Sequence, residues 1–346
     1  MIDLKLLSKI CETPGAPGYE KKIRDVIIKE VEKYVDEFYI DNIGNLVTKI
    51  KGKGSKKIMV AAHMDEIGFI TTHIDKNGFI RFHTLGGFDP KTLTAQRVIV
   101  HGKKDIVGVM GTKPVHVMSP EEKKTPPKTT DFFIDTGMTK KELEKYISIG
   151  DTITRKCDLI EIGESVSCKS LDNRISVFIL IEVLKKIKNP PHDFYGVFTV
   201  QEEVGLRGAM TSTLDILPDY GFGLDTTIAF DVPGSQEHQK ITELGQGVAI
   251  KVMDSSTICD YRMVSYMTEL AQKNKIKHQK EILTAGGTDT AGIQRMRPGG
   301  SIAGALSIPT RHIHSHVESV NKEDVINTIK MLEICVQNIE NHNWEH

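Results

Sequence analysis

The sequence predicts an α/β fold, a mostly parallel mixed sheet flanked by helices, with a small all-β domain inserted into it. Before residue 67 and after residue 158, apolar strand-like runs alternate with helix-like segments, and this alternation is typical of a sheet covered by helices. Residues 67–158 contain only short β-rich pieces punctuated by Gly and Pro. We therefore expect a discontinuous α/β domain, 1–66 with 159–346, and an inserted, barrel-like domain over 67–158.

The α/β part should open with two amphipathic helices and then alternate strands with helices, as the apolar periodicity indicates. The helices are expected at about 3–12, 19–35, 172–188, 205–214, 260–274, 289–296 and from 322 onward. The strands are expected at about 46–52, 56–63, 194–200, 222–230, 247–252, 278–283 and 300–306.

Composition excludes several classes of protein. Lys and Arg total 45 against 46 for Asp and Glu, so no net field draws the chain to nucleic acid or to an acidic membrane. The five cysteines are scattered without a Cys-x-x-Cys motif, which argues against a disulfide framework and a thiolate zinc site and suits a reducing cytoplasm. No apolar run reaches the roughly 20 residues of a membrane span, so we expect a soluble cytoplasmic protein.

Groups that can bind metal follow three of the expected strands. His63 and Asp65 follow one apolar run, Glu202 and Glu203 follow the next, and Asp231 follows a third. Ligands of open α/β sheets gather beyond the carboxyl ends of the strands. Each residue alone could be a turn residue or a helix cap, but their convergence on one sheet edge predicts a metal site.

The chemistry of these side chains suggests how they would divide the work. Imidazole nitrogen and carboxylate oxygen suit zinc, cobalt or manganese, and a carboxylate can bridge two ions that share a water. Glu203 would bind metal, and Glu202 would take a proton from the water and pass it to the leaving amine. Asp65 would orient His63 from behind. Asp172 precedes an apolar helix, where an N-cap is the simpler interpretation.

Three histidines alternate near the C-terminus, at His312, His314 and His316. If this segment is extended, all three imidazoles share one face. The pattern alone does not say which of the three histidines would bind a metal.

Several ordered motifs together make the chain resemble the tetrahedral (TET) aminopeptidases, dinuclear metallopeptidases also described as glutamyl aminopeptidase or endoglucanase homologues. The motifs are GAPGYE at 15–20, HMDEIGF at 63–69, LDNR at 171–174, TVQEEVGLRGA at 199–209, AFDVP at 229–233, GGTD at 286–289 and PTRHIHS at 309–315. The resemblance runs through nearly the whole chain and implies a zinc-peptidase-like sheet.

The resemblance implies a specific set of metal ligands. It makes Asp172 the bridging ligand, with His63 and Asp231 completing one metal and Glu203 and His314 completing the other. Zinc or cobalt would be the metals.

The resemblance also implies an activity and an assembly. Glu202 would be the general base and Asp65 the partner of His63, and the activity would be removal of N-terminal residues from peptides. The inserted β-rich segment resembles the family's dimerisation domain. Dimers would assemble into a hollow dodecamer with inward-facing active sites.

Two positions depart from the family pattern, because His312 stands where Tyr is more common and His316 where Pro is. A changed ligand or pocket wall at these positions therefore stays open, and so does the preferred N-terminal residue. The endoglucanase label suggests a glycoside hydrolase as an alternative, but glycosidase carboxylates stand about 5 to 9.5 Å apart across the sugar, which adjacent residues do not achieve easily. A catalytically silent peptide-binding shell is the other alternative.

Overall fold

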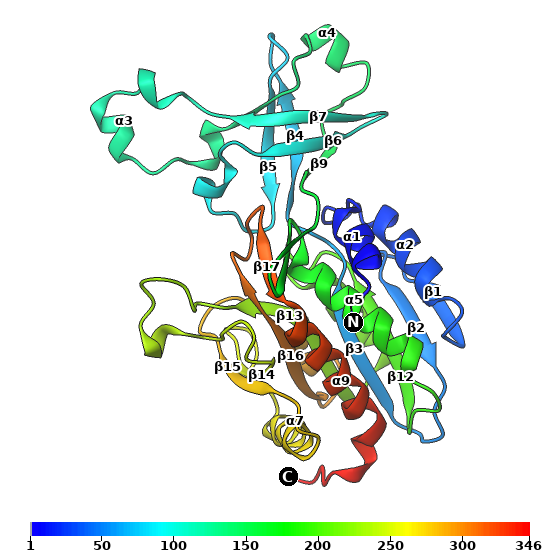
Figure 1. The fold of residues 1–346 in the computed structure, drawn as a ribbon. Coiled ribbons are helices and arrows are strands. Elements are labelled where there is room, and N and C mark those ends of the chain that lie inside the picture. Colours follow the sequence, from blue (N-terminus) through cyan, green and yellow to red (C-terminus); the bar gives the residue numbers. More distant parts are fainter. Residues whose placement is uncertain (1) are drawn as a thin grey trace.

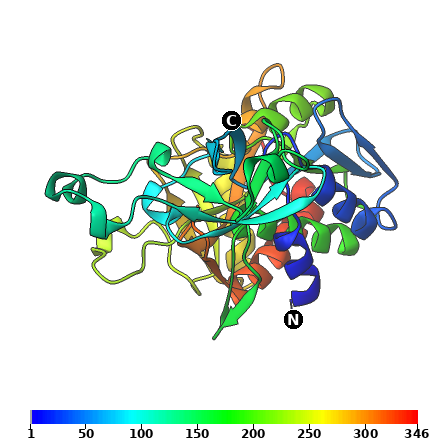
Figure 2. The same cartoon turned by 90° about the horizontal axis from the view of Figure 1, so that it is seen from above.

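The computed structural model describes residues 2–346 and has two parts, a large α/β domain and a small closed barrel above it (Figure 1). The predicted fold class is confirmed. Seen from above, the barrel lies over one end of the α/β domain, and the segment that contains α3 (Pro120–Lys124) projects to one side (Figure 2).

The α/β domain is built on an 11-stranded mixed sheet in the order β1-β2-β12-β3-β13-β16-β17-β11-β10; off this path, β14 pairs with β16, and β15 pairs with β14. Four central strands, β12, β3, β13 and β16, run parallel to one another. The strands are β1 (Glu37–Ile40), β2 (Leu46–Ile50), β3 (Lys57–His63), β10 (Ile160–Ile162), β11 (Ser165–Cys168), β12 (Asp193–Thr199), β13 (Tyr220–Ile228), β14 (Val248–Met253), β15 (His278–Ile282), β16 (Ile302–Arg311) and β17 (Glu318–Asn321).

Helices cover both faces of this sheet, which explains why its central strands are almost continuously apolar. In β3, Val60 packs into the core beneath α5 and α9, while Met59 and Ala61 pack into a smaller core on the opposite face. Helices α6 and α8 contact the sheet there. The longer helices are α1 (Leu4–Glu12), α2 (Lys21–Val31), α5 (Leu171–Lys186), α6 (Arg207–Ile216), α7 (Tyr261–Lys273), α8 (Thr290–Arg295) and α9 (Lys322–Asn338).

The barrel closes in the order β4-β5-β8-β7-β6-β9 around its own apolar core. In β7, Ile106 and Met110 are buried in the barrel whereas Val107 and Val109 are about half exposed on its outside. This is the two-residue alternation of a strand with one buried face. The strands are β4 (Gly68–Ile74), β5 (Ile80–Leu85), β6 (Arg97–His101), β7 (Asp105–Gly111), β8 (Phe133–Asp135) and β9 (Thr152–Arg155), and the short helix α4 spans Lys140–Leu143.

The sheet has strands that the apolar periodicity did not predict, namely β1, β10, β11 and β17. They are three or four residues long, and β1 and β10 are exposed throughout, so they carry little periodic signal. Two expected strand ends were also wrong. β16 continues to Arg311 instead of ending near 306, and β13 ends at Ile228 instead of 230.

Across residues 2–346, no helix combines the length and the apolar character that a membrane crossing requires.

Candidate metal centre

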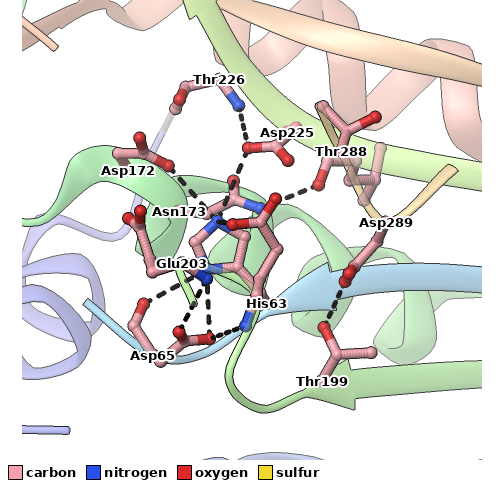
Figure 3. A network of polar contacts seen from close by, with 12 residues as sticks. His63, Asp65, Asp172, Asn173, Thr199, Glu203, Asp225, Thr226, Thr288 and Asp289 are labelled. Carbon is pink, nitrogen blue, oxygen red and sulfur yellow. Dashed lines mark hydrogen bonds and ion pairs between the residues drawn. The ribbon is translucent and has the colours of Figure 1, made fainter. Parts of the chain in front are cut away.

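His63 is the last residue of β3 and its imidazole is almost completely buried at the carboxyl edge of the parallel strands. Its Nε2 lies 3.4 Å from Asp172 Oδ1 and 3.7 Å from Asp225 Oδ1. The other nitrogen, Nδ1, faces Asp65, 3.3 Å from its carbonyl oxygen and 3.4 Å from Oδ1 (Figure 3). With Nδ1–H donated to Asp65, Nε2 would be the nitrogen available to a metal shared with the two aspartates.

Asp172 stands between two groups of side chains that could bind metal. It lies in the first turn of α5, where it and Asn173 have non-helical φ and ψ angles and are joined by a cis peptide bond. Its Oδ1 faces His63 and its Oδ2 lies 3.3 Å from His314 Nε2. Its backbone N–H donates to Glu318 Oε2 at 2.8 Å. The Asp172 carboxylate is thus directed at two imidazoles.

Two groups of three ligand atoms meet at Asp172. His63, Asp172 and Asp225 form one, and Asp172, Glu203 and His314 form the other; in each, one ligand atom per residue lies within 4.8 Å of the others. Glu203 Oε2 is 3.4 Å from His314 Nε2, and Glu203 Oε1 is buried without a hydrogen-bond partner. Imidazole and carboxylate donors of this kind suit a pair of divalent cations.

The structure does not bring Asp231 to this cluster, contrary to the expectation from the sequence. Its carboxylate accepts hydrogen bonds from Arg311 Nε and Nη2, both at 2.6 Å, and from the Leu244 N–H at 2.9 Å. Asp225 takes the place expected for Asp231. The expectation failed because it took the first acid after the apolar run, while Asp225 lies within β13, where its side chain points at His63 (Figure 3).

A different signal in the sequence could have found Asp225. It is a charged residue inside an otherwise uncharged, buried strand, and a buried carboxylate needs a charged or hydrogen-bonding partner.

Glu202 and Glu203 lie in the loop after β12, and Asp65 holds this loop. The N–H groups of Glu202 and Glu203 donate to Asp65 Oδ1 and Oδ2 at 3.1 and 3.2 Å. Gln201 adopts a left-handed conformation with φ of 54°, so the chain leaves the strand here. Glu202 Oε2 lies 3.8 Å from His63 Nε2. Asp65 thus orients both His63 and the two glutamates.

The electrostatics of the cluster favour added positive charge. Burial raises the pKa of Glu203 to about 8 and raises that of Glu202 well above its ordinary value. Burial alone would lower the pKa of His314, but the carboxylates of Glu203 and Asp172 outweigh it and raise that pKa to about 10. Crowded carboxylates in a buried site are stabilised by bound cations.

The three C-terminal histidines do not share a face, because His312 and His314 have left-handed φ angles of 60° and 59° and the segment turns. His312 is exposed. His316 is partly buried, with an unpartnered Nδ1, and belongs to neither ligand group. His314 is the histidine that joins the cluster.

A cavity of about 540 Å³ opens beside the cluster. Beyond the charged site residues it is lined mainly by apolar and small side chains. These include Leu206, Ile228, Leu283, Ala285, Gly286, Gly287 and Ile313.

The cavity wall also carries a lysine, the fully buried Lys251. Its Nζ lies 2.9 Å from Glu281 Oε1 and 3.1 Å from Asp254 Oδ2. Its charge is therefore already neutralised by two buried carboxylates.

Comparison with known proteins gives a consistent result. The family model of the M42 glutamyl aminopeptidases matches residues 44–331. The lysyl aminopeptidase of Pyrococcus furiosus is 33% identical over 98% of each chain. An aminopeptidase structure from Desulfurococcus kamchatkensis is 36% identical with a TM-score of 0.92, covering 96% of this chain and 94% of its own. The TET1 peptidase of Pyrococcus horikoshii, which can assemble into a tetrahedron or a large octahedral shell, is 33% identical with a TM-score of 0.87, covering 96% and 98%.

A matched pair of substitutions can show whether Asp225 or Asp231 is the metal ligand. We expect Asp225→Asn to weaken zinc binding by about tenfold or more, since even partners behind a ligand change metal affinity by roughly 10–100-fold. Asp231→Asn should leave zinc affinity within about twofold, because this carboxylate binds Arg311. Calorimetric zinc titration of both variants measures this, and the opposite ranking would restore the assignment made from the sequence.

Proposed function

This chain belongs to the M42 glutamyl aminopeptidase family and is an aminopeptidase, and from that premise we propose that it uses two divalent metal ions held by His63, Asp172, Asp225, Glu203 and His314. The observation that carries the proposal is the position of Asp172, whose two oxygens face the two histidines. Zinc and cobalt suit these donors best. When bound, such a pair polarises the scissile carbonyl and lowers the pKa of a water.

Glu202 is the residue we assign as general base. Its carboxylate lines the cavity beside the ligand groups, and burial raises its pKa well above the ordinary value, which makes it a stronger proton acceptor than a carboxylate in water. It takes a proton from the attacking water and delivers it to the leaving amine. Asp65 accepts hydrogen bonds from the N–H groups of Glu202 and Glu203. The general base Glu202 and the proposed metal ligand Glu203 therefore keep fixed positions relative to each other.

The cavity wall supports a preference for neutral, apolar N-terminal residues. Leu206, Leu283 and Ile313 offer contacts to an apolar side chain. A glutamate side chain would find Lys251 already bound to Glu281 and Asp254, and a lysine would be buried among apolar groups. Burying either charge without a partner is costly.

The alternative of a glycoside hydrolase finds no support in this arrangement. It would leave His63 and His314 without a role, although both are directed at Asp172. The two glutamates also follow one another in a single loop.

Homo-oligomerisation is supported by the assembling relative of Pyrococcus horikoshii, and we propose a dodecamer built from dimers. Residues 67–158 would form the dimerisation domain. Its outer surface exposes Val107 and Val109 on β7, and Val115 and Val117 in the segment after that strand. We propose that these side chains belong to the apolar patch of the dimer interface. The five free cysteines suit a reducing cytoplasm.

Loss of the base should separate catalysis from metal binding. We expect Glu202→Gln to lower kcat by about 10²- to 10⁴-fold, the usual contribution of a general base, while zinc stoichiometry stays as in the wild type. Hydrolysis of leucyl-p-nitroanilide and metal analysis measure the two quantities. Full activity in this variant, or in chelator-stripped wild type, would contradict the mechanism.

Substrate preference is tested by a panel of aminoacyl-p-nitroanilides assayed with zinc and with cobalt. We expect kcat/KM for leucine and methionine to exceed that for glutamate and lysine by at least about tenfold, the smaller end of what one buried interaction discriminates. A clear preference for either charged residue would refute the assignment of the pocket. Tight peptide binding without product would favour the silent shell instead.

Assembly is tested by placing charge on the outer face of β7. The double substitution Val107→Asp with Val109→Asp should shift the particle from dodecamer to smaller species in light scattering coupled to size exclusion, because buried unpaired carboxylates oppose association. Leu214→Asp, on an exposed position of α6, is the matched control. An unchanged particle in the double variant would exclude β7 from the interface.

A further inference from the structure

Arg155 is a barrel residue whose side chain reaches the α/β domain. It ends β9, where the preceding Ile153 packs into the barrel core. The Arg155 side chain is only 1% exposed, and its Nη1 donates a hydrogen bond to the carbonyl oxygen of Ser315. Ser315 directly follows His314, so Arg155 holds the turn that carries this histidine.

The same guanidinium faces a carboxylate that supports Asp172. Arg155 Nη2 lies 3.8 Å from Glu318 Oε1. The other oxygen of Glu318, Oε2, accepts the backbone N–H of Asp172 at 2.8 Å. Arg155 and Glu318 are both completely buried in their side chains, so neither charge is screened by water. Two separate connections therefore run from Arg155 to the metal cluster.

The barrel also packs against the site through the loop after β5. Phe88 lies near the guanidinium, with 5.9 Å between its ring centroid and Arg155 Cζ. A Cβ at Gly87 would lie 3.4 Å from His314 Nδ1, and one at Gly86 would lie 3.3 Å from Glu203 Cβ. One wall of the metal cluster is thus made by the barrel, and Arg155 is the charged member of this wall.

The burial of Arg155 calls for an explanation beyond the stability of the barrel. Its Nε and Nη2 are buried without a hydrogen-bond partner, and an incompletely bonded buried charge is a poor way to stabilise a domain contact. A methionine of similar length would fill the same space without this cost. The guanidinium instead holds the Ser315 carbonyl in one orientation by its hydrogen bond, and it places a positive charge beside Glu318.

We propose that Arg155 is a positioning residue of the metal centre, supplied by the inserted barrel, which fixes His314 through Ser315 and Asp172 through Glu318. The proposal rests on the metal centre of the proposed function. It means that the barrel helps to set the geometry of the active site in addition to any part it has in assembly.

The test uses the full-length protein loaded with Co²⁺, whose visible absorption reports ligand geometry directly. Arg155→Met should lower the thermal midpoint, because Glu318 is left as an unpaired buried charge. At a temperature where the variant is fully folded, its Co²⁺ affinity should still fall at least about tenfold, the range seen when partners behind metal ligands are removed, with altered absorption bands. Arg81→Met is the matched control, because Arg81 is likewise a barrel arginine that donates to backbone carbonyls, but those of Thr130 and Phe132 lie within the barrel. It should leave the spectrum unchanged.

A rescue variant distinguishes positioning from general stability. Glu318→Gln keeps an oxygen for the Asp172 N–H but removes the charge that Arg155→Met leaves unpaired. The double variant should therefore recover part of the lost Co²⁺ affinity, which would not follow from a role in packing alone.

A conservative variant keeps the proposal testable if Arg155→Met does not fold. Arg155→Lys retains the charge but not the fork that reaches two partners, so its Co²⁺ affinity should fall at least about threefold at a similar thermal midpoint. Wild-type affinity and spectrum in a folded Arg155 variant would overturn the proposal. A wild type that binds two Co²⁺ yet hydrolyses no peptide would overturn the proposed activity and leave the role of Arg155 standing.

Discussion

The structure is organised around one electrostatic constraint, the burial of Asp172 among other carboxylates at the edge of the central sheet. Asp225, Glu202 and Glu203 crowd the same buried space, so burial and mutual repulsion oppose their ionisation. Two histidines face the Asp172 carboxylate and hold its pKa well below the ordinary value. Such an arrangement is costly for a protein by itself and favourable for one that holds cations.

The surrounding fold keeps these groups in place mainly through backbone hydrogen bonds. Asp65 accepts the N–H groups of Glu202 and Glu203, and Glu318 accepts that of Asp172. Each of these supporting carboxylates comes from a different part of the chain than the residues it holds. The parallel strands β3, β12 and β13 make this possible, because their carboxyl ends meet at one edge.

The barrel contributes residues to the surroundings of the buried cluster. Its strands carry their own core, yet Arg155 and the Gly86–Phe88 loop extend from it toward the cluster. The barrel therefore exposes apolar side chains on its outside and also forms one wall of the buried cluster.

The sequence by itself determined the fold class and the family resemblance, because these depend on local patterns, and it named four of the five residues that the structure brings together. Apolar periodicity marked the central strands, and His63 and the pair Glu202 and Glu203 follow them directly. Short exposed strands such as β1 and β10 were missed, since three or four residues with no buried face leave no period to detect.

Only the tertiary structure decided between Asp225 and Asp231. The two residues lie close together in the sequence, at the end of the same apolar run, and they differ in the direction of the side chain and in its partner. One points from the strand toward His63, and the other binds Arg311. The turn at His312 and His314 likewise depends on left-handed backbone that no periodicity predicts. The contact of Arg155 with Ser315 joins residues 160 positions apart, and such pairs are fixed by the packing of whole domains.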